Sequence, residues 1–184
     1  MMFKKLGFGL LAFATLSIHA LGNDYDQPVR TVKKVDAAKY VGRWYQISAN
    51  PMPFEAGCIC SQQTLKIVTA TELSVYNSCN RNSVDGPFTD IYGTAYNDEP
   101  ETNSKFTVDF GLGFPGKYWI IAVDWNYRWA VVTDPARKSL YILSKTPKLS
   151  SWQYRRAVRA AKKQIDTSKL VMMNQENCNY PPEA

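Results

Sequence analysis

The residues with the most reactive side chains in this chain are four cysteines, Cys58, Cys60, Cys79 and Cys178. Thiols can form disulfides, bind zinc or act as nucleophiles, and the cellular compartment decides between these uses. An even number of cysteines in an exported chain favours two disulfides, and three connectivities are open. Zinc is disfavoured because the spacing is irregular and the compartment is oxidising. We therefore expect disulfides, no metal site and no cofactor.

Export is predicted by residues 1–22, which have the pattern of a secretory signal peptide. Lys4 and Lys5 precede an apolar run over 6–18, and small residues follow at 20–22. The run is shorter than the roughly 20 residues that span a bilayer, and no cysteine at the cleavage point offers a lipid anchor. We expect an exported, soluble protein, periplasmic or secreted, that is not lipid-anchored.

The only histidine, His19, lies within this leader. A chain cut after residue 22 has no imidazole, which excludes Ser-His-Asp and Cys-His catalysis as well as His-ligated zinc. A thiol or a carboxylate such as Asp90 or Asp109 would remain, but no spacing marks a carboxylate pair. We therefore expect the protein not to be an enzyme.

The remaining chain, residues 23–184, is long enough for a single domain with a core. Its composition, 45% hydrophobic and 21% charged for the whole sequence, is that of a globular protein. Cleavage of the leader would leave 20 Lys and Arg against 16 Asp and Glu, a net charge near +4. This modest charge on a chain dominated by β patterns does not predict a nucleic acid partner.

Between Tyr40 and Pro147, short runs of aromatic and β-branched residues alternate with turn-forming clusters. Phe106, Val108 and Phe110 alternate with polar neighbours, as in a strand with one dry and one wet face. This spacing favours an antiparallel barrel or sandwich over βαβ units. The eight expected strands span 43–49, 59–68, 72–79, 88–96, 105–110, 117–124, 128–133 and 139–145.

After Pro147 the periodicity becomes helical, and Ser150 or Ser151 can cap the helix. One face is basic. The apolar stripe consists of Tyr154, Ala157, Val158, Ala161 and Ile165, and the basic face of Arg155, Arg156, Arg159, Lys162 and Lys163.

Three motifs, in this order and separation, resemble the signature blocks of the lipocalins. They are Gly42-Arg43-Trp44, then Val123-Asp124-Trp125 with Tyr127-Arg128, and then Leu140-Tyr141-Ile142-Leu143-Ser144-Lys145-Thr146-Pro147. The segments 54–57 and 118–124 are similar to the apolipoprotein D and bacterial outer-membrane lipocalin branch. The resemblance covers 36–178. It implies a mainly β fold, an eight-stranded antiparallel up-and-down β-barrel with one C-terminal α-helix packed outside, wide enough for one small ligand.

The same resemblance implies a barrel floor made of Gly42, Trp44, Asp124 and Lys145. Trp44 would close the narrow end, and Lys145 would lie across its indole ring. The family usually has Arg at this position, whose planar guanidinium stacks better on an indole, so the lysine is expected to loosen the floor.

Counting by twos from Lys145 and from Tyr118 gives the inward residues, among them Ala122. Tyr92, Tyr96 and Tyr118 are expected to determine how far the barrel is filled. For any single position, packing in a dry core is as good an interpretation as ligand contact. The expected ligand-binding residues are Trp44, Phe54, Phe106, Val108, Phe110, Phe114, Tyr118, Ile120, Tyr141 and Leu143.

The loops at the wide end of such a barrel would carry unusually apolar side chains. The loops span 50–57, 80–87, 111–116 and 135–139, and the side chains are Met52, Phe54, Leu112 and Phe114. They would form an entrance that dips into a membrane, or they would fold over one another.

The lipocalin pattern also implies a disulfide pairing. The C-terminal segment is tied to the start of the second strand, which implies Cys60 with Cys178 and leaves Cys58 with Cys79. Because Cys58 and Cys60 lie two residues apart on one strand, they are expected to point to the same face, and the swapped pairing stays open.

Together these patterns favour a protein that binds and transports or stores a small hydrophobic ligand such as a fatty acid or lysophospholipid, with a role in membrane maintenance. The basic helix face could contact anionic lipid surfaces, or it could simply be solvated. The alternatives are a lipocalin-type enzyme that uses a cavity thiol or carboxylate, and a pigment-binding oligomer. Trp125, Tyr127 and Trp129 look exposed and leave oligomerisation open.

Overall fold

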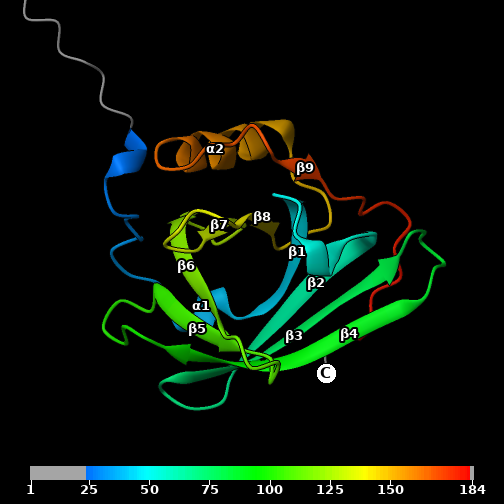
Figure 1. Ribbon diagram of the computed structural model, residues 1–184, viewed down its shortest axis with the longest axis horizontal. Coiled ribbons are helices and arrows are strands. Elements are labelled where there is room, and N and C mark those ends of the chain that lie inside the picture. The colour runs from blue at the N-terminus through cyan, green and yellow to red at the C-terminus, as the bar shows by residue number, and fades with distance from the viewer. Residues whose placement is uncertain (1–23, 183–184) are drawn as a thin grey trace, which may run out of the picture.

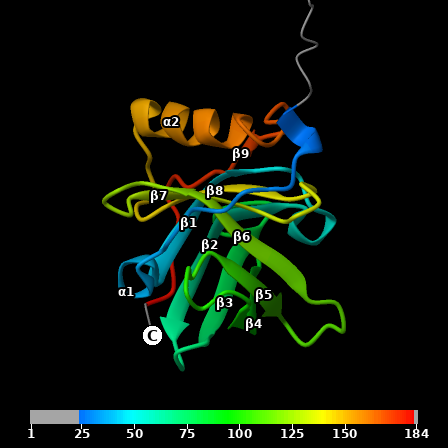
Figure 2. The same ribbon diagram turned by 90° about the vertical axis from the view of Figure 1, so that its left-hand side faces the viewer.

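The computed structural model describes residues 24–182 (Figures 1 and 2), so the predicted leader at 1–22 lies outside the described residues. The strands are β1 (Gly42–Ala49), β2 (Cys58–Ile67), β3 (Glu72–Arg81), β4 (Phe88–Asn97), β5 (Lys105–Asp109), β6 (Gly116–Val123), β7 (Trp129–Thr133), β8 (Leu140–Ser144) and β9 (Val171–Met172). The helices are α1 (Ala37–Tyr40), α2 (Ser151–Lys162) and the 3-10 turns η1 (Asp24–Asp26) and η2 (Pro53–Glu55).

The strands follow one another around the sheet in chain order, from β2 through β8 to β1, and β1 pairs with β2 to close the barrel. Every pairing is antiparallel. The predicted eight-stranded up-and-down barrel is therefore confirmed. Four elements were not predicted: the 3-10 turns η1 and η2, α1, which precedes β1, and β9, which pairs with Ser48 and Ala49 at the end of β1.

Register shifts interrupt three strands, between Gln46 and Ser48 in β1, between Ile59 and Gln62 in β2, and between Ile120 and Ala122 in β6. A bulge changes which face the following side chains occupy, so counting by twos fails beyond it. The expectation that Ala122 points inward is wrong for this reason, since Ala122 packs in the outer cluster beneath α2.

Helix α2 lies across the outside of the barrel over β6, β7 and β8 (Figures 1 and 2). It begins at a capping box in which Ser150 and Gln153 exchange hydrogen bonds. The predicted stripe faces the barrel, where Ala157 and Ala161 are fully buried. Trp129 is also buried in this cluster, at 5% exposure, so the expectation that it is exposed is wrong.

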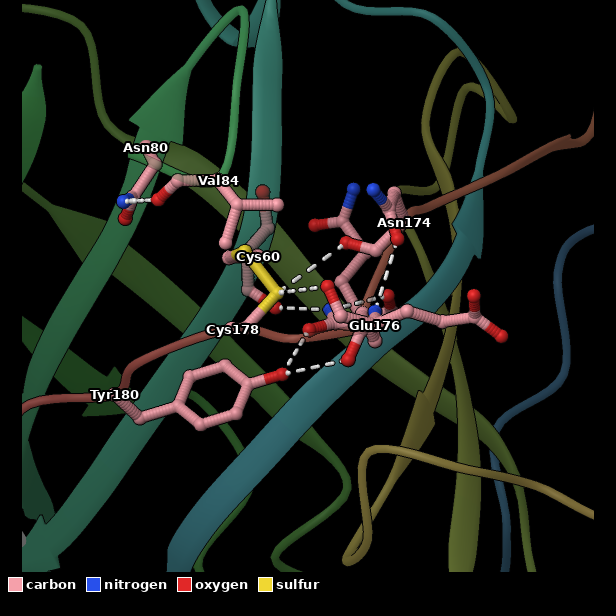
Figure 3. Close-up of a disulfide and its surroundings, with 10 residues drawn as sticks. Cys60, Asn80, Val84, Asn174, Glu176, Cys178 and Tyr180 are labelled. Carbon is pink, nitrogen blue, oxygen red and sulfur yellow. Dashed lines mark hydrogen bonds between the residues drawn. A yellow bond between two sulfur atoms is a disulfide. The ribbon is translucent and has the colours of Figure 1, made fainter. Parts of the chain in front are cut away.

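Two disulfides, Cys58–Cys79 and Cys60–Cys178, match the pairing that the family resemblance implies. The two cysteines of β2 do not share one face, however. Cys60 has a φ of 55° within the bulge, which breaks the alternation that would make them point together. The second disulfide attaches the C-terminal tail to the outside of β2, where Asn174 accepts a hydrogen bond from the Cys60 amide (Figure 3).

Candidate functional site

The narrow end of the barrel is closed by Trp44, whose exposed fraction is 0%. Its indole N–H donates to the carbonyl oxygen of Tyr40 at 2.7 Å. The Lys145 ammonium lies 4.2 Å from the centre of the indole ring and donates to the carbonyl oxygens of Tyr40 and Val41 at 3.0 and 2.6 Å. The lysine that replaces the usual arginine therefore covers the indole face and also holds the end of α1.

Gly42 and Asp124 also lie at this closed end. Gly42 has a φ of +91°, which other residues rarely adopt, and a Cβ there would make only an ordinary contact of 3.5 Å with the Lys145 ammonium, so the backbone conformation is what favours glycine. Asp124 instead organises the β6–β7 turn, where it accepts hydrogen bonds from the Arg128 guanidinium at 2.7 and 3.1 Å. Burial alone would raise the pKa of Asp124, but the Arg128 hydrogen bonds outweigh it and the pKa lies below its ordinary value.

The predicted lining residues that belong to strands come together inside the barrel. They form one cluster that contains Trp44, Phe106, Val108, Phe110, Tyr118, Ile120, Tyr141 and Leu143. Toward the floor these side chains are packed in the core, with Phe106 and Leu143 each 4% exposed. Phe110, Tyr118 and Tyr141 face the same lumen but are only partly buried. The inward side chains are therefore tightly packed toward the floor and partly exposed at Phe110, Tyr118 and Tyr141.

The two remaining predicted lining residues, Phe54 and Phe114, lie on loops at the mouth and are 65% and 76% exposed. Leu112, two residues before Phe114 in the same loop, is 57% exposed. They form an apolar rim and do not fold over one another into a buried cluster.

A carboxylate at the mouth was not predicted as part of the site. Glu55 in η2 accepts a hydrogen bond from the buried Gln46 amide at 3.2 Å, and burial raises its pKa. Arg81 holds this turn by donating to the carbonyl oxygens of Ala56 and Phe54. Burial and the nearby charge of Glu55 raise the pKa of Tyr141. Gln46 lies two residues after Trp44 on β1, a spacing that could have identified it.

Tyr92 and Tyr96 do not fill the barrel, and that expectation is wrong. They are 71% and 46% exposed, and Tyr92 stacks against Tyr76 with the ring centres 4.6 Å apart. Ala95 and Val108, which pair across β4 and β5, are the inward residues here, so alternation places both tyrosines outside.

Two hollows lie at the closed end, and the smaller one is lined in part by the inward residues Leu73 and Phe106. One of about 230 Å³ is bounded by Ala37, the β2–β3 turn and Asn103, and one of about 400 Å³ by Lys39, Trp125 and Tyr127. Phe54, Leu112 and Phe114 of the apolar rim line neither hollow.

The residues proposed for an enzymatic alternative do not converge in the lumen. All four cysteines are paired in disulfides. Asp90 accepts a hydrogen bond from Tyr76 on the outer face, and Asp109 alternates with the inward Val108. The thiol alternative therefore has no free nucleophile.

This geometry is a closed antiparallel barrel with a tryptophan floor and an apolar inner face. A family model for the lipocalin-like domain matches residues 35–175. The chain belongs to the lipocalin family.

Individual relatives cover most of the chain. Outer membrane lipoprotein Blc of Escherichia coli K12 is 32% identical over 90% of this chain and 96% of its own length. Apolipoprotein D of Mus musculus is 29% identical over 97% of this chain and 96% of its own length. Insecticyanin from the tobacco hornworm Manduca sexta has the same fold, with a TM-score of 0.66 at 24% identity, covering 83% of this chain and 88% of that chain.

Within residues 24–182, neither helix combines the length and the hydropathy that crossing a membrane requires.

Proposed function

We propose that this protein binds and carries a small hydrophobic ligand, such as a fatty acid or lysophospholipid, in the barrel lumen. The observation that carries the proposal is the change in burial along the inward face: Trp44 and Ile120 are fully buried at the base, whereas Phe110 and Tyr141 are partly exposed above them. An apolar concave surface that is closed at one end and open at the other is the usual form of a site for such ligands. The relatives named lipoprotein and apolipoprotein support a lipid ligand.

The direct test is a titration of the delipidated protein with cis-parinaric acid, a fluorescent fatty acid, followed by displacement with palmitic acid and with lysophosphatidylcholine. Placing a charge in the lumen with Phe110→Glu should weaken binding by at least about tenfold, because the carboxylate must be desolvated or excludes the chain. The matched variant Phe88→Glu, on the outer surface at 49% exposure, should bind as the parent does. Equal binding by the two variants would place the ligand outside the lumen.

The apolar rim supports a further part of the proposal, that the mouth contacts a lipid surface during uptake. Phe54 and Phe114 are among the most exposed large apolar side chains of the described residues. We expect Phe54→Ser/Phe114→Ser to slow the transfer of a fluorescent fatty acid from vesicles by about tenfold, because each lost aromatic removes apolar area from the bilayer contact. Trp125→Ser is the control, since Trp125 is equally exposed, at 76%, but lies at the closed end. If the control slows transfer as much as the double variant, the mouth has no special part in uptake.

The location proposed for this activity is outside the cytoplasm, in the periplasm or the secreted fraction, with cleavage of residues 1–22. The support is the signal-peptide pattern and the pair of disulfides, since disulfides persist in oxidising compartments. A role in membrane maintenance would follow from lipid uptake at such a surface.

A further inference from the structure

Polar side chains cross the base of the lumen directly above the tryptophan floor. Gln63 on β2 is the pairing partner of Trp44 on β1, and three strands separate β2 from β6 in each direction around the barrel. Gln63 nevertheless donates a hydrogen bond to the Tyr118 hydroxyl on β6 at 2.8 Å. The Tyr40 hydroxyl, which arrives from α1, lies 2.8 Å from the same oxygen. The bridge therefore joins opposite walls of the barrel and the end of α1.

Asn77 extends this arrangement along the wall. It is the pairing partner of Gln63 on the adjacent strand, and it follows Leu73 and Val75 at steps of two residues, so it shares their lumen-facing side of β3. Its side-chain oxygen is buried and has no hydrogen-bond partner. We call Tyr40, Gln63, Asn77 and Tyr118 the inner polar layer. A buried acceptor without a partner costs roughly 1–3 kcal/mol, so a ligand that donates to it would recover that cost.

The layer can donate as well as accept. Tyr40 and Tyr118 have two hydroxyl protons between them, and their mutual hydrogen bond uses one. Burial raises the pKa of Tyr40 well above its ordinary value and that of Tyr118 to about 12, so both phenols are neutral at physiological pH. A neutral layer with a spare donor and a spare acceptor matches a hydroxyl group, which itself donates once and accepts twice.

Access comes from the mouth side. Asn77 lies nearer the mouth than the buried Val75 on β3, Tyr118 lies nearer the mouth than the fully buried Ile120 on β6, and both side chains are only partly buried. A chain that enters through the mouth therefore meets Asn77 and Tyr118 before it reaches the floor.

We propose that the inner polar layer is the inner end of the ligand site and receives a hydroxyl group, so that the carried ligand is a lipid hydroxylated at the end that enters first. This inference rests on the proposed function and names the class of ligand for the same lumen. An unsubstituted hydrocarbon end would leave the Asn77 oxygen and the spare hydroxyl proton unpaired, and sites built to bind a hydroxyl discriminate against ligands without one.

The test uses displacement of cis-parinaric acid from the delipidated protein by lauric, myristic and palmitic acids, each compared with its ω-hydroxy counterpart. The two members of a pair share the carboxylate head and differ only at the far end. At the chain length that reaches the layer, the ω-hydroxy acid should bind about tenfold more tightly than the plain acid, the effect of one or two added hydrogen bonds. Equal or weaker binding of the hydroxy acid at every length would overturn the inference.

Variants show whether a preference for the hydroxy acid comes from this layer or from the different aqueous solubility of the two acids. Tyr118→Phe removes one hydroxyl from the layer, and Asn77→Leu removes its unpaired acceptor while keeping the size of the side chain. Each should abolish the preference for the hydroxy acid over the plain acid of the same length. Tyr92→Phe, which removes a hydroxyl from the outer surface, should keep the preference. A preference that persists in both layer variants would overturn the inference, whereas failure of all the acids to displace the probe would overturn the proposed function as well.

Discussion

Replacing Trp44 with alanine should lower the free energy of unfolding by about 3–5 kcal/mol, the usual cost of removing a large aromatic side chain from a core. The side chain is completely buried and packs against the Tyr40 ring, with the ring centres 5.0 Å apart. Its loss would also leave the Tyr40 carbonyl without the indole N–H and the Lys145 ammonium without the ring beneath it. The measurement is urea denaturation followed by circular dichroism.

The control for this experiment is Trp125→Ala, which removes the same side chain from a position that is 76% exposed and near the same end of the barrel. We expect a change within about 0.5 kcal/mol there, as for most surface substitutions. Losses of similar size in the two variants would contradict the assignment of Trp44 as the plug of the barrel.

Trp44 and Trp129 show what the sequence could predict and what it could not. Trp44 stands in a recognisable motif at the start of a strand, and its place at the floor follows from the family resemblance. Trp129 lies beside the equally aromatic Trp125 and Tyr127, and nothing local distinguishes them. Only the packing of α2 over β7 makes Trp129 buried and leaves Trp125 in solvent.

Bulges are a second feature that limits the prediction of inward positions from the sequence. Alternation correctly placed Phe106, Val108 and Phe110 inside, because β5 pairs without a register shift. It failed at Ala122 and for the pair Cys58 and Cys60, where β6 and β2 each contain a shift. A bulge depends on contacts with the partner strand, so the sequence of a single strand does not reveal it.

Tyr118 was predicted as a lining residue, but the two amides of the inner polar layer were missed for a different reason. Gln63 and Asn77 lie at inward positions of β2 and β3, but amides in a strand are more often exposed, and the sequence contains no sign that Gln63 reaches Tyr118. That contact requires the closure of the barrel, which brings β2 and β6 to face one another across the lumen. Counting by twos from Leu65 would have marked Gln63 as inward, although not its partner.

The largest effect of removing a disulfide is expected for Cys60→Ser/Cys178→Ser. This disulfide closes a loop with a sequence separation of 118, whereas Cys58–Cys79 closes one of 21. On chain entropy alone, loss of the longer loop should cost about 5 kcal/mol of folding free energy, and loss of the shorter one, tested with Cys58→Ser/Cys79→Ser, about 3 kcal/mol. Denaturation of both variants and the parent without reductant measures the difference.

The structure adds a second reason to expect the larger loss of stability when the Cys60–Cys178 disulfide is removed. The tail that Cys178 anchors packs on β1 and β2: the Gln175 amide donates to the carbonyl oxygens of Gln46 and Ser61 at 2.9 and 2.7 Å, and the Tyr180 ring lies edge-on to Tyr45. These contacts are held close by the disulfide, so its removal should also expose the tail to proteolysis under native conditions. The shorter disulfide joins β2 and β3, which an extensive hydrogen-bonded register already holds together. If the Cys58/Cys79 variant were the less stable of the two, loop entropy and tail anchoring would not be the main contributions of these disulfides.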